Sequence, residues 1–203
     1  MDENVLAAMA RWPDVPAAYG WLSLDPRGQW RLHPDGDSAA GGPGTPITHP
    51  GIARFMQRNY TGDAHGNWYV QNGPQRVYVR LDAAPFILRR ADRGPGLQTH
   101  TGLAVRHVAQ WWLDPGQGQL YALTDAGPAR VDDRELPGIL QMLRTAEGQP
   151  LIDRLEAPLP EAGQALAAPA GQGPGALLRS LGERDAAEVL GFVRQPAAGK
   201  PLR

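Results

Sequence analysis

One stretch of the sequence, residues 68–81, constrains the fold more than any other because it has the pattern of a β-hairpin. Apolar and polar side chains alternate with a period of two on both sides of an Asn-Gly-Pro-Gln turn, which is typical of strands that bury one face. This turn places Val70 opposite Val77 and Tyr69 opposite Tyr78. The apolar face, which we predict to be core, consists of Trp68, Val70, Val77 and Val79.

The other face of this hairpin carries the side chains that we select as a candidate ligand-binding site. Tyrosine and arginine dominate binding hot spots, and aromatic rings beside arginines suit stacked, anionic ligands such as nucleotides. The alternative is that a second subdomain or another copy of the chain packs on this face, because half-aromatic outer faces are also typical of packing. The candidate ligand-binding residues are Tyr69, Gln71, Asn72, Gln75, Arg76, Tyr78 and Arg80.

Charge and cysteine content exclude several classes of function. A formal net charge of −1 provides no field for strong nucleic-acid binding. The sequence contains no cysteine, which excludes disulfides, thiolate zinc sites and thiol nucleophiles. No stretch approaches the roughly 20 apolar residues of a membrane span, and the acidic N-terminus has no secretory signal pattern. We therefore expect a cytoplasmic protein that binds no membrane.

The N-terminal part of the chain, residues 1–92, is predicted to form a first subdomain. We expect a hairpin at its Asp-Pro-Arg-Gly turn, followed by a helix that Thr48 caps, with Ile47 and Ile52 as a hydrophobic staple. This helix should pack against the 68–81 hairpin through its apolar stripe. The stripe predicted to be buried contains Ile52, Phe55, Met56 and Tyr60.

The following residues, 93–157, are predicted to form a second, β-rich subdomain. Short strand-like runs precede a helix over 133–144, for which Asp132 and Glu135 provide a capping box. Asp132 and Asp133 are adjacent and could be interpreted as a catalytic pair of carboxylates. Helix capping explains them better.

The last segment, residues 158–203, has the composition of a flexible linker and tail. Alanine, proline and glycine dominate its first part and cannot bury a core. Spaced leucines then predict a helix over 176–194, which either docks on the chain or folds on a partner.

The two predicted subdomains share a short sequence pattern. An aromatic strand, an Asp-Pro turn and a Gly-Gln pair occur around residues 24–29 and again around 113–119. The pattern indicates either a domain duplication or the chance recurrence of a common hairpin turn. The predicted fold class is α+β, with two small related subdomains of antiparallel β-hairpins, each packed with a helix.

The predicted first subdomain contains three short motifs: Gly20-Trp21-Leu22, the turn Asn72-Gly73-Pro74-Gln75-Arg76, and Pro85-Phe86. With their spacing, they resemble a family of uncharacterised proteobacterial proteins of unknown function and, more distantly, the family known as domain of unknown function 1285. The resemblance covers about residues 1–157. It implies a bacterial protein of two related subdomains, the second loosely similar to a pleckstrin-homology fold, with a ligand site between them.

Recognisable catalytic and metal-binding patterns are missing from the sequence. The histidines at 33, 49, 65, 100 and 107 show no metal-ligand spacing, and no glycine-rich loop carries the lysine of a phosphate-binding loop. We therefore assign no catalytic residue, no metal site and no cofactor.

These observations favour a non-enzymatic bacterial ligand-binding or regulatory module, acting in signal transduction. Its site between the subdomains would hold a small anionic or nucleotide-like ligand. One alternative is a small hydrolase-like enzyme whose acid and base come from distant residues such as His65 and Asp82. Another is a protein-protein interaction module that uses the 176–194 helix. A second copy of the chain, forming a homodimer, or another protein is expected as a partner.

Overall fold

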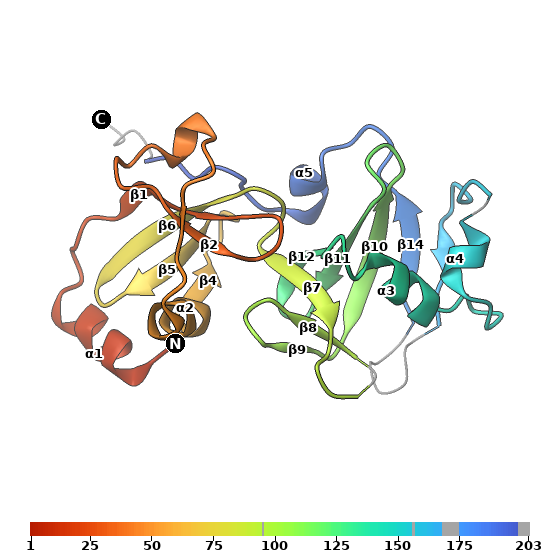
Figure 1. The fold of residues 1–203 in the computed structure, drawn as a ribbon, viewed down its shortest axis with the longest axis horizontal. Coiled ribbons are helices and arrows are strands. Elements are labelled where there is room, and N and C mark those ends of the chain that lie inside the picture. The colour runs from red at the N-terminus through yellow and green to blue at the C-terminus, as the bar shows by residue number, and fades with distance from the viewer. Residues whose placement is uncertain (95, 156, 168–174, 199–203) are drawn as a thin grey trace. The chain divides into compact units, whose positions relative to one another are not determined.

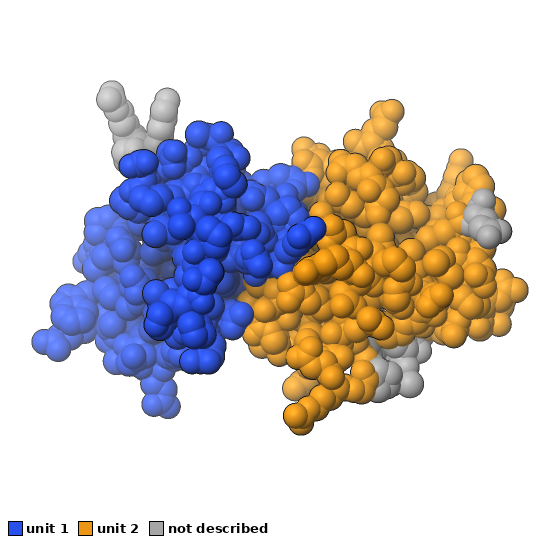
Figure 2. Space-filling view, viewed as in Figure 1, with its two compact units in different colours: residues 1–83, 192–203 blue, residues 84–191 orange. Residues whose placement is uncertain are grey.

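The computed structural model describes residues 1–94, 96–155, 157–167 and 175–198 (Figure 1). They form two compact units, which Figure 2 shows in different colours. Unit 1 contains residues 1–83 and 192–203, and unit 2 contains residues 84–191. Each unit has its own β-sheet and a few helices, which confirms the predicted α+β class.

Unit 1 contains a sheet of six described strands in the order β3-β2-β1-β6-β5-β4. Strands β1 and β6 are parallel, and the other neighbours are antiparallel. The strands are β1 (Ala18–Leu24), β2 (Trp30–Leu32), β3 (Thr45–Pro46), β4 (Tyr60–Gly62), β5 (Trp68–Asn72) and β6 (Gln75–Leu81). The helices are α1 (Glu3–Arg11), the short 3-10 helix η1 (Ser38–Ala40) and α2 (Pro50–Arg58).

The central hairpin is formed by β5 and β6, and its register is the predicted one. Tyr69 pairs with Tyr78, and Val70 pairs with Val77. Gly73 lies between the strands with a φ of +56°, in the left-handed region that glycine adopts without steric cost. The local alternation and the turn residues therefore suffice to fix this pairing.

The core of unit 1 lies between α2 and the sheet. Trp30 and Tyr60 meet edge to face with ring centroids 5.0 Å apart, and Tyr60 also meets Trp68 at 5.0 Å. Helix α2 contacts β5, as the apolar stripe predicted. Three of the four predicted core residues, Trp68, Val70 and Val79, are buried. The fourth, Val77, is half-buried.

The start of α2 differs from the prediction. The N-cap is His49, not Thr48, and its ring Nδ1 accepts hydrogen bonds from the main-chain N–H groups of Gly51 and Ile52. Pro50 occupies the first helical position, where its missing N–H costs nothing, so the residue before it becomes the cap.

Unit 2 contains a sheet of eight described strands in the order β13-β14-β10-β11-β12-β7-β8-β9. The strands are β7 (Phe86–Arg90), β8 (Leu97–Thr99), β9 (Ala104–Val105), β10 (Val108–Asp114), β11 (Gln119–Thr124), β12 (Gly127–Val131), β13 (Gln164–Ala165) and β14 (Leu177–Ser180). Three short helices complete the described part: α3 (Leu136–Met142), α4 (Leu151–Arg154) and α5 (Ala186–Leu190).

The boundary between the units falls after residue 83, earlier than the predicted position near residue 92. The cause is β7, which runs parallel to β12 with Phe86 opposite Ala129 and so belongs to the second sheet. Pairing between residues so far apart in sequence leaves no trace in the local pattern.

The predicted helix over 133–144 is shorter in the structure and begins at Leu136. Asp132 does not form the capping box, because its carboxylate is engaged by Arg134 at 2.8 Å and Arg89 at 3.1 Å. Pro137 lies in the first helical turn, which also favours the later start.

The predicted helix over 176–194 is wrong. Its first leucines form β14, which runs parallel to β10, and only α5 is helical. Gly182, with a φ of +60°, lies between β14 and α5, and Gly191, with a φ of +72°, ends α5, because that conformation interrupts both strands and helices.

The segment predicted to be linker and tail is partly built into the fold. β13, within the predicted linker, pairs with β14. Residues 192–198 return to unit 1, where the Val193 N–H donates to the Gly66 carbonyl at 2.9 Å and the Leu81 N–H donates to the Arg194 carbonyl at 2.7 Å. Residues 168–174 and 199–203 of the predicted linker and tail lie outside the described residues.

The two similar turns share one stabilising device. Asp25 accepts main-chain hydrogen bonds from Arg27 and Gln29, and Asp114 accepts them from Gly116 and Gln117. Both turns connect antiparallel strands. Duplication remains a prediction, since aspartate at the first position of a turn commonly makes such bonds.

Candidate functional site

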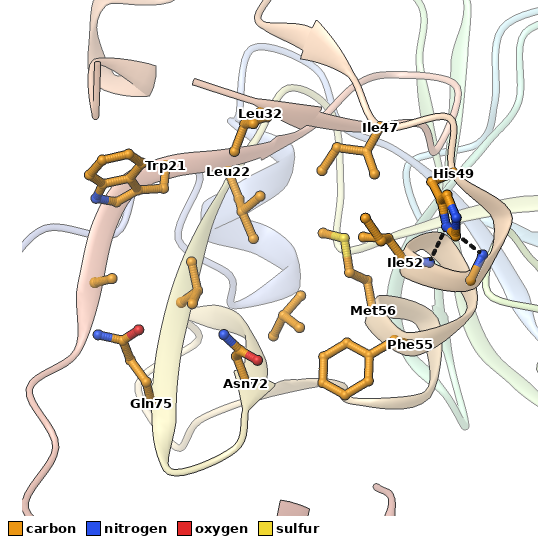
Figure 3. Close-up of a pocket in the computed structure, with 14 residues that line it drawn as sticks. Trp21, Leu22, Leu32, Ile47, His49, Ile52, Phe55, Met56, Asn72 and Gln75 are labelled. Atoms are coloured by element: carbon orange, nitrogen blue, oxygen red, sulfur yellow. Dashed lines mark hydrogen bonds between the residues drawn. The ribbon is translucent and has the colours of Figure 1, made fainter. Parts of the chain in front are cut away.

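Unit 1 contains a solvent-open groove of about 820 Å³ between α2 and the sheet, which we call the apolar groove (Figure 3). Helix α2 supplies one wall with Ile52, Phe55 and Met56. These positions are spaced i, i+3 and i+4, so they share one face of the helix. Gly51, in the first turn of α2, also lines the groove. The remaining lining residues come from the sheet and its connections and are Ala18, Trp21, Leu22, Leu32, Ile47, His49, Val70, Asn72, Gln75 and Val77.

A bulge in β1 brings two consecutive side chains to the groove. Ala18 is opposite Val77 and Leu22 is opposite Val79, so β1 has two more residues than β6 over this stretch. Gly20, within it, has a φ of +85°. Because a bulge breaks the alternation of a strand, Trp21 and Leu22 both line the groove.

Three large apolar side chains of the groove remain in contact with solvent. Ile52 is 50% exposed, Trp21 44% and Leu32 39%. The predicted burial of the whole α2 stripe is therefore wrong at Ile52, whereas Met56 is buried as expected. An open groove with several apolar walls marks a binding site more often than isolated exposed side chains do.

One end of the groove is polar and neutral. Asn72 and Gln75 are opposite each other at the end of the β5–β6 hairpin, and Figure 3 shows both carboxamides at the end away from Leu32 and Ile47. The Gln75 Nε2 donates to the Pro16 carbonyl at 3.1 Å. None of the described residues forms a hydrogen bond with the Asn72 carboxamide.

No aspartate, glutamate, lysine or arginine lines the groove in the described part of the chain. His49 is the titratable residue of the lining, and its Nδ1 accepts from Gly51 at 3.2 Å and from Ile52 at 3.4 Å. The groove therefore suits an uncharged, mainly apolar molecule.

The structure divides the seven residues predicted from the sequence as a ligand site. Asn72 and Gln75 line the apolar groove. Tyr78 and Arg80 line a smaller cavity of about 240 Å³, together with Tyr19 and residues 195–198. Tyr69, Gln71 and Arg76 line neither cavity.

The aromatic part of the predicted site is packed within unit 1. Tyr19 stacks on Tyr78 with centroids 4.7 Å apart and planes at 6°, and burial together with the nearby Tyr78 raises the pKa of Tyr19. The Tyr78 hydroxyl donates to Asp63 at 3.3 Å. Burial raises the pKa of Asp63, but hydrogen bonds from Asn67 and Tyr78 outweigh it and lower the pKa below its usual value.

The two arginines of the predicted site are engaged by neighbouring groups. Arg80 is buried, pairs with Asp82 at 2.8 Å and donates to the carbonyls of Ser38 and Gly42. The Arg76 guanidinium lies 4.8 Å from the centre of the Tyr69 ring. Gln71 is buried, and its Nε2 donates to the Gly73 carbonyl at 2.9 Å.

The acid and base suggested for an enzyme are not joined by any contact among the described residues. The Asp82 carboxylate pairs with Arg80, and the main chain of His65 donates to Asp63. The described residues also contain no group of three or more His, Asp or Glu side chains that could hold a metal ion.

A serine–histidine–aspartate series that the sequence did not reveal lies in unit 1. Ser23 Oγ is 2.9 Å from His33 Nε2, and His33 Nδ1 is 3.7 Å from Asp37 Oδ1. Ser23 is 0% exposed, so no substrate reaches its hydroxyl. The serine–histidine pair therefore satisfies buried polar groups.

The apolar groove shows where sequence reasoning was incomplete. Glycine within the β1 pattern was a signal for the bulge that brings Trp21 to the groove. The exposure of Ile52 had no such signal, because an amphipathic stripe does not show how much of it a neighbour covers.

The fold and groove together define an α+β protein of two sheet-containing units, one of which carries an open, uncharged, mainly apolar groove. The chain belongs to the family described as "Protein of unknown function (DUF2946)", whose model, DUF2944, matches residues 1–197. Membership confirms the expected relation to a family of unknown function. No curated protein matches the chain significantly.

Two solved structures of DUF1285 family proteins are similar to this chain. The protein from Silicibacter pomeroyi DSS-3 is 19% identical, with a TM-score of 0.49, over 82% of this chain and 84% of that chain. The protein from Shewanella baltica OS155 is 14% identical, with a TM-score of 0.41, over 57% of this chain and 86% of that chain. Within the described ranges of the present structure, no helix has the length and apolar character needed to cross a membrane.

Proposed function

We propose that this protein is a non-enzymatic ligand-binding module with a regulatory role, and that unit 1 holds a small, uncharged, mainly apolar molecule in the apolar groove. The observation that carries this proposal is the solvent exposure of Trp21, Leu32 and Ile52 around one groove whose described lining contains no Asp, Glu, Lys or Arg side chain. A ligand that covers them gains about 25 cal/mol for each Å² of apolar surface removed from water.

The size of the groove supports a small molecule as the occupant. Its volume of about 820 Å³ lies within the range of roughly 300–1,000 Å³ that is usual for small-molecule sites. Its mixture of many apolar walls and a few polar groups at one end is also typical of such sites.

A neutral ligand replaces the anionic one that the hairpin sequence suggested. The groove offers no cation among its described lining residues, and moving an unpaired charge into an apolar site is costly. Two of the seven predicted residues, Asn72 and Gln75, are retained in this proposal as the polar end of the site.

Fluorescence titration with N-phenylnaphthylamine, a neutral apolar dye that brightens when it leaves water, tests this proposal. We expect saturable binding to the full chain and about tenfold weaker binding to Ile52→Gln, because the substitution removes part of the apolar wall. Leu103→Gln is the matched control, since Leu103 has a similar exposure of 51% but lies in unit 2.

Equal dye affinity in wild type, Ile52→Gln and Leu103→Gln would show that the dye binds elsewhere and would contradict the proposal. Circular dichroism and thermal unfolding of both variants establish that their folds are intact. Ile52 is half exposed, so its substitution is expected to change stability little.

A further inference from the structure

The polar end of the apolar groove contains two carboxamides that face the same space. Asn72 and Gln75 are direct cross-strand partners, and directly opposed residues have Cβ atoms about 4.5–5.5 Å apart on the same face of a sheet. Both side chains line the groove (Figure 3). They can therefore contact one small polar group at the same time.

The hydrogen-bonding capacity that remains on these carboxamides is mixed. Gln75 uses one Nε2 hydrogen on the Pro16 carbonyl, which orients its side chain and leaves Oε1 as an acceptor. Asn72 has no hydrogen-bond partner among the described residues, so its Nδ2 donors and its Oδ1 acceptor are available. The pair thus offers both donors and acceptors to a ligand.

Arg76, the arginine nearest in sequence, does not add a positive charge to this pair of neutral carboxamides. Arg76 follows Gln75 in β6, and successive side chains of a strand point to opposite faces. Its guanidinium lies against the Tyr69 ring, and Arg76 is not among the groove residues. Among the described lining residues, a carboxylate in the groove would meet no lysine or arginine, and an ammonium would meet no aspartate or glutamate.

On the basis of the function proposed above, we infer that the ligand has a neutral head group that both donates and accepts hydrogen bonds, such as a primary carboxamide or a lactam. The head group donates to Oε1 of Gln75 and accepts from Nδ2 of Asn72. Its apolar body then lies along Val70, Val77 and the α2 wall. A carboxylate cannot donate to Gln75 Oε1, and an ammonium cannot accept from Asn72 Nδ2, so neither ion forms both of these bonds.

Three probes with the same alkyl body test the head group: octanamide, octanoate and octylammonium. Calorimetric titration of the full chain at neutral pH gives the affinity of each probe. We expect octanamide to bind at least about tenfold more tightly than either ion, because only the amide can both donate to Gln75 Oε1 and accept from Asn72 Nδ2, and because neither ion has an oppositely charged Asp, Glu, Lys or Arg among the described lining residues to offset its desolvation.

The variants Asn72→Leu and Gln75→Leu test the assignment of the residues. We expect the ratio of octanamide to octanoate affinity to fall to about threefold or less in Gln75→Leu, and the ratio of octanamide to octylammonium affinity to fall likewise in Asn72→Leu, since the ion in each ratio cannot form the bond that the variant removes. A ratio is used because a general change in affinity cancels in it. Gln117→Leu is the matched control, since Gln117 is an exposed carboxamide in a hairpin turn of unit 2 and should leave both ratios unchanged.

The outcomes separate this inference from the function on which it depends. Dye binding that weakens in Ile52→Gln, together with equal affinity for the three probes or a preference for octanoate, would overturn the head-group inference and leave the apolar site in place. Failure of the dye and all three probes to bind would overturn both. An amide preference that survives in both leucine variants would contradict the roles of Asn72 and Gln75.

Discussion

His49 and Ile52 are linked by a hydrogen bond at the start of α2, where the His49 Nδ1 accepts from the main-chain N–H of Ile52 at 3.4 Å. The same nitrogen accepts from Gly51 at 3.2 Å, so one imidazole satisfies two N–H groups that a helix start leaves without partners. Both side chains also line the apolar groove. The helix cap and the groove wall are therefore parts of one local structure.

Replacing this cap should destabilise the protein. We expect His49→Ala to lower the free energy of unfolding by about 1 kcal/mol, and His49→Asp to restore most of it, because aspartate is an efficient N-cap. Urea denaturation measures both. Thr48→Ala serves as the control, and a larger loss in this variant than in His49→Ala would contradict the assignment of the cap.

The bulge of β1 should not tolerate a side chain at Gly20. A Cβ there would clash with the Gly36 carbonyl oxygen, and the φ is +85°. We expect Gly20→Ala to lower the free energy of unfolding by at least about 2 kcal/mol, since backbone strain and a steric clash add together. Thermal denaturation gives this value.

The variant Gly41→Ala separates the cost of backbone strain from the cost of the steric clash. Gly41 has a similar φ of +81°, but a Cβ would meet no atom within 4 Å. Its substitution should therefore cost only the strain, about 1–2 kcal/mol. Equal destabilisation by the two alanines would show that the close approach of Gly36 contributes nothing.

Unit 2 should depend on the ionised form of Asp132. The hydrogen bond from the Arg134 side chain, supported by a second from its main chain, holds the pKa of Asp132 well below its usual value. Because the pKa is lower in the folded state, the interaction stabilises the fold above the unfolded pKa of about 3.9 and is lost as the pH falls below it.

The matching experiment compares Asp132→Asn with Asp92→Asn, an exposed carboxylate of the same unit. At neutral pH, we expect Asp132→Asn to cost about 1–3 kcal/mol, because charge-assisted bonds to Arg89 and Arg134 are lost. The difference between this variant and wild type should shrink on acidification from pH 4 downwards, because Asp132 takes up a proton in the unfolded state at a higher pH than in the folded state, which favours unfolding of the wild type. A difference that stays constant with pH would contradict the role of the charge.

The polar face of the hairpin should contribute to packing and not to binding of the apolar dye. We expect Arg76→Ala to reduce stability by about 0.5–1 kcal/mol through loss of the contact with Tyr69, and to leave the dye affinity unchanged. Parallel denaturation and dye titrations measure the two effects. Weaker dye binding in this variant would indicate that the ligand binds at the Tyr69 and Tyr78 face, which was selected from the sequence.

The parts of the fold that were predictable depend on neighbours in sequence. The pairing of Tyr69 with Tyr78 follows from alternation and turn chemistry within a few residues. The assignment of β7 to unit 2 depends on Phe86 pairing with Ala129, and such a long-range parallel contact leaves no local signal.

The candidate site was predictable only at its polar end. Asn72 and Gln75 were selected because they flank the hairpin turn. The sequence grouped them with Tyr69 and Tyr78, but in the structure they line the groove together with Val70 and Val77. The apolar walls were assigned to the core, since a sequence shows that Ile52 belongs to an apolar helix face but not that half of it stays exposed. The aromatic face was selected as a candidate ligand site with packing as the alternative, and the sequence did not show that Tyr19, which covers Tyr78, would do so from a different strand far away in sequence.

The apolar groove is tested most directly by mapping the main-chain amide NMR shifts of the full chain during titration with N-phenylnaphthylamine. We predict that the shifts that change most are those of groove residues in unit 1, above all Leu22, Ile52, Val70 and Asn72, and that they saturate together. Changes confined to unit 2, changes centred on Tyr69 and Arg80, or no saturable change would contradict the proposed site.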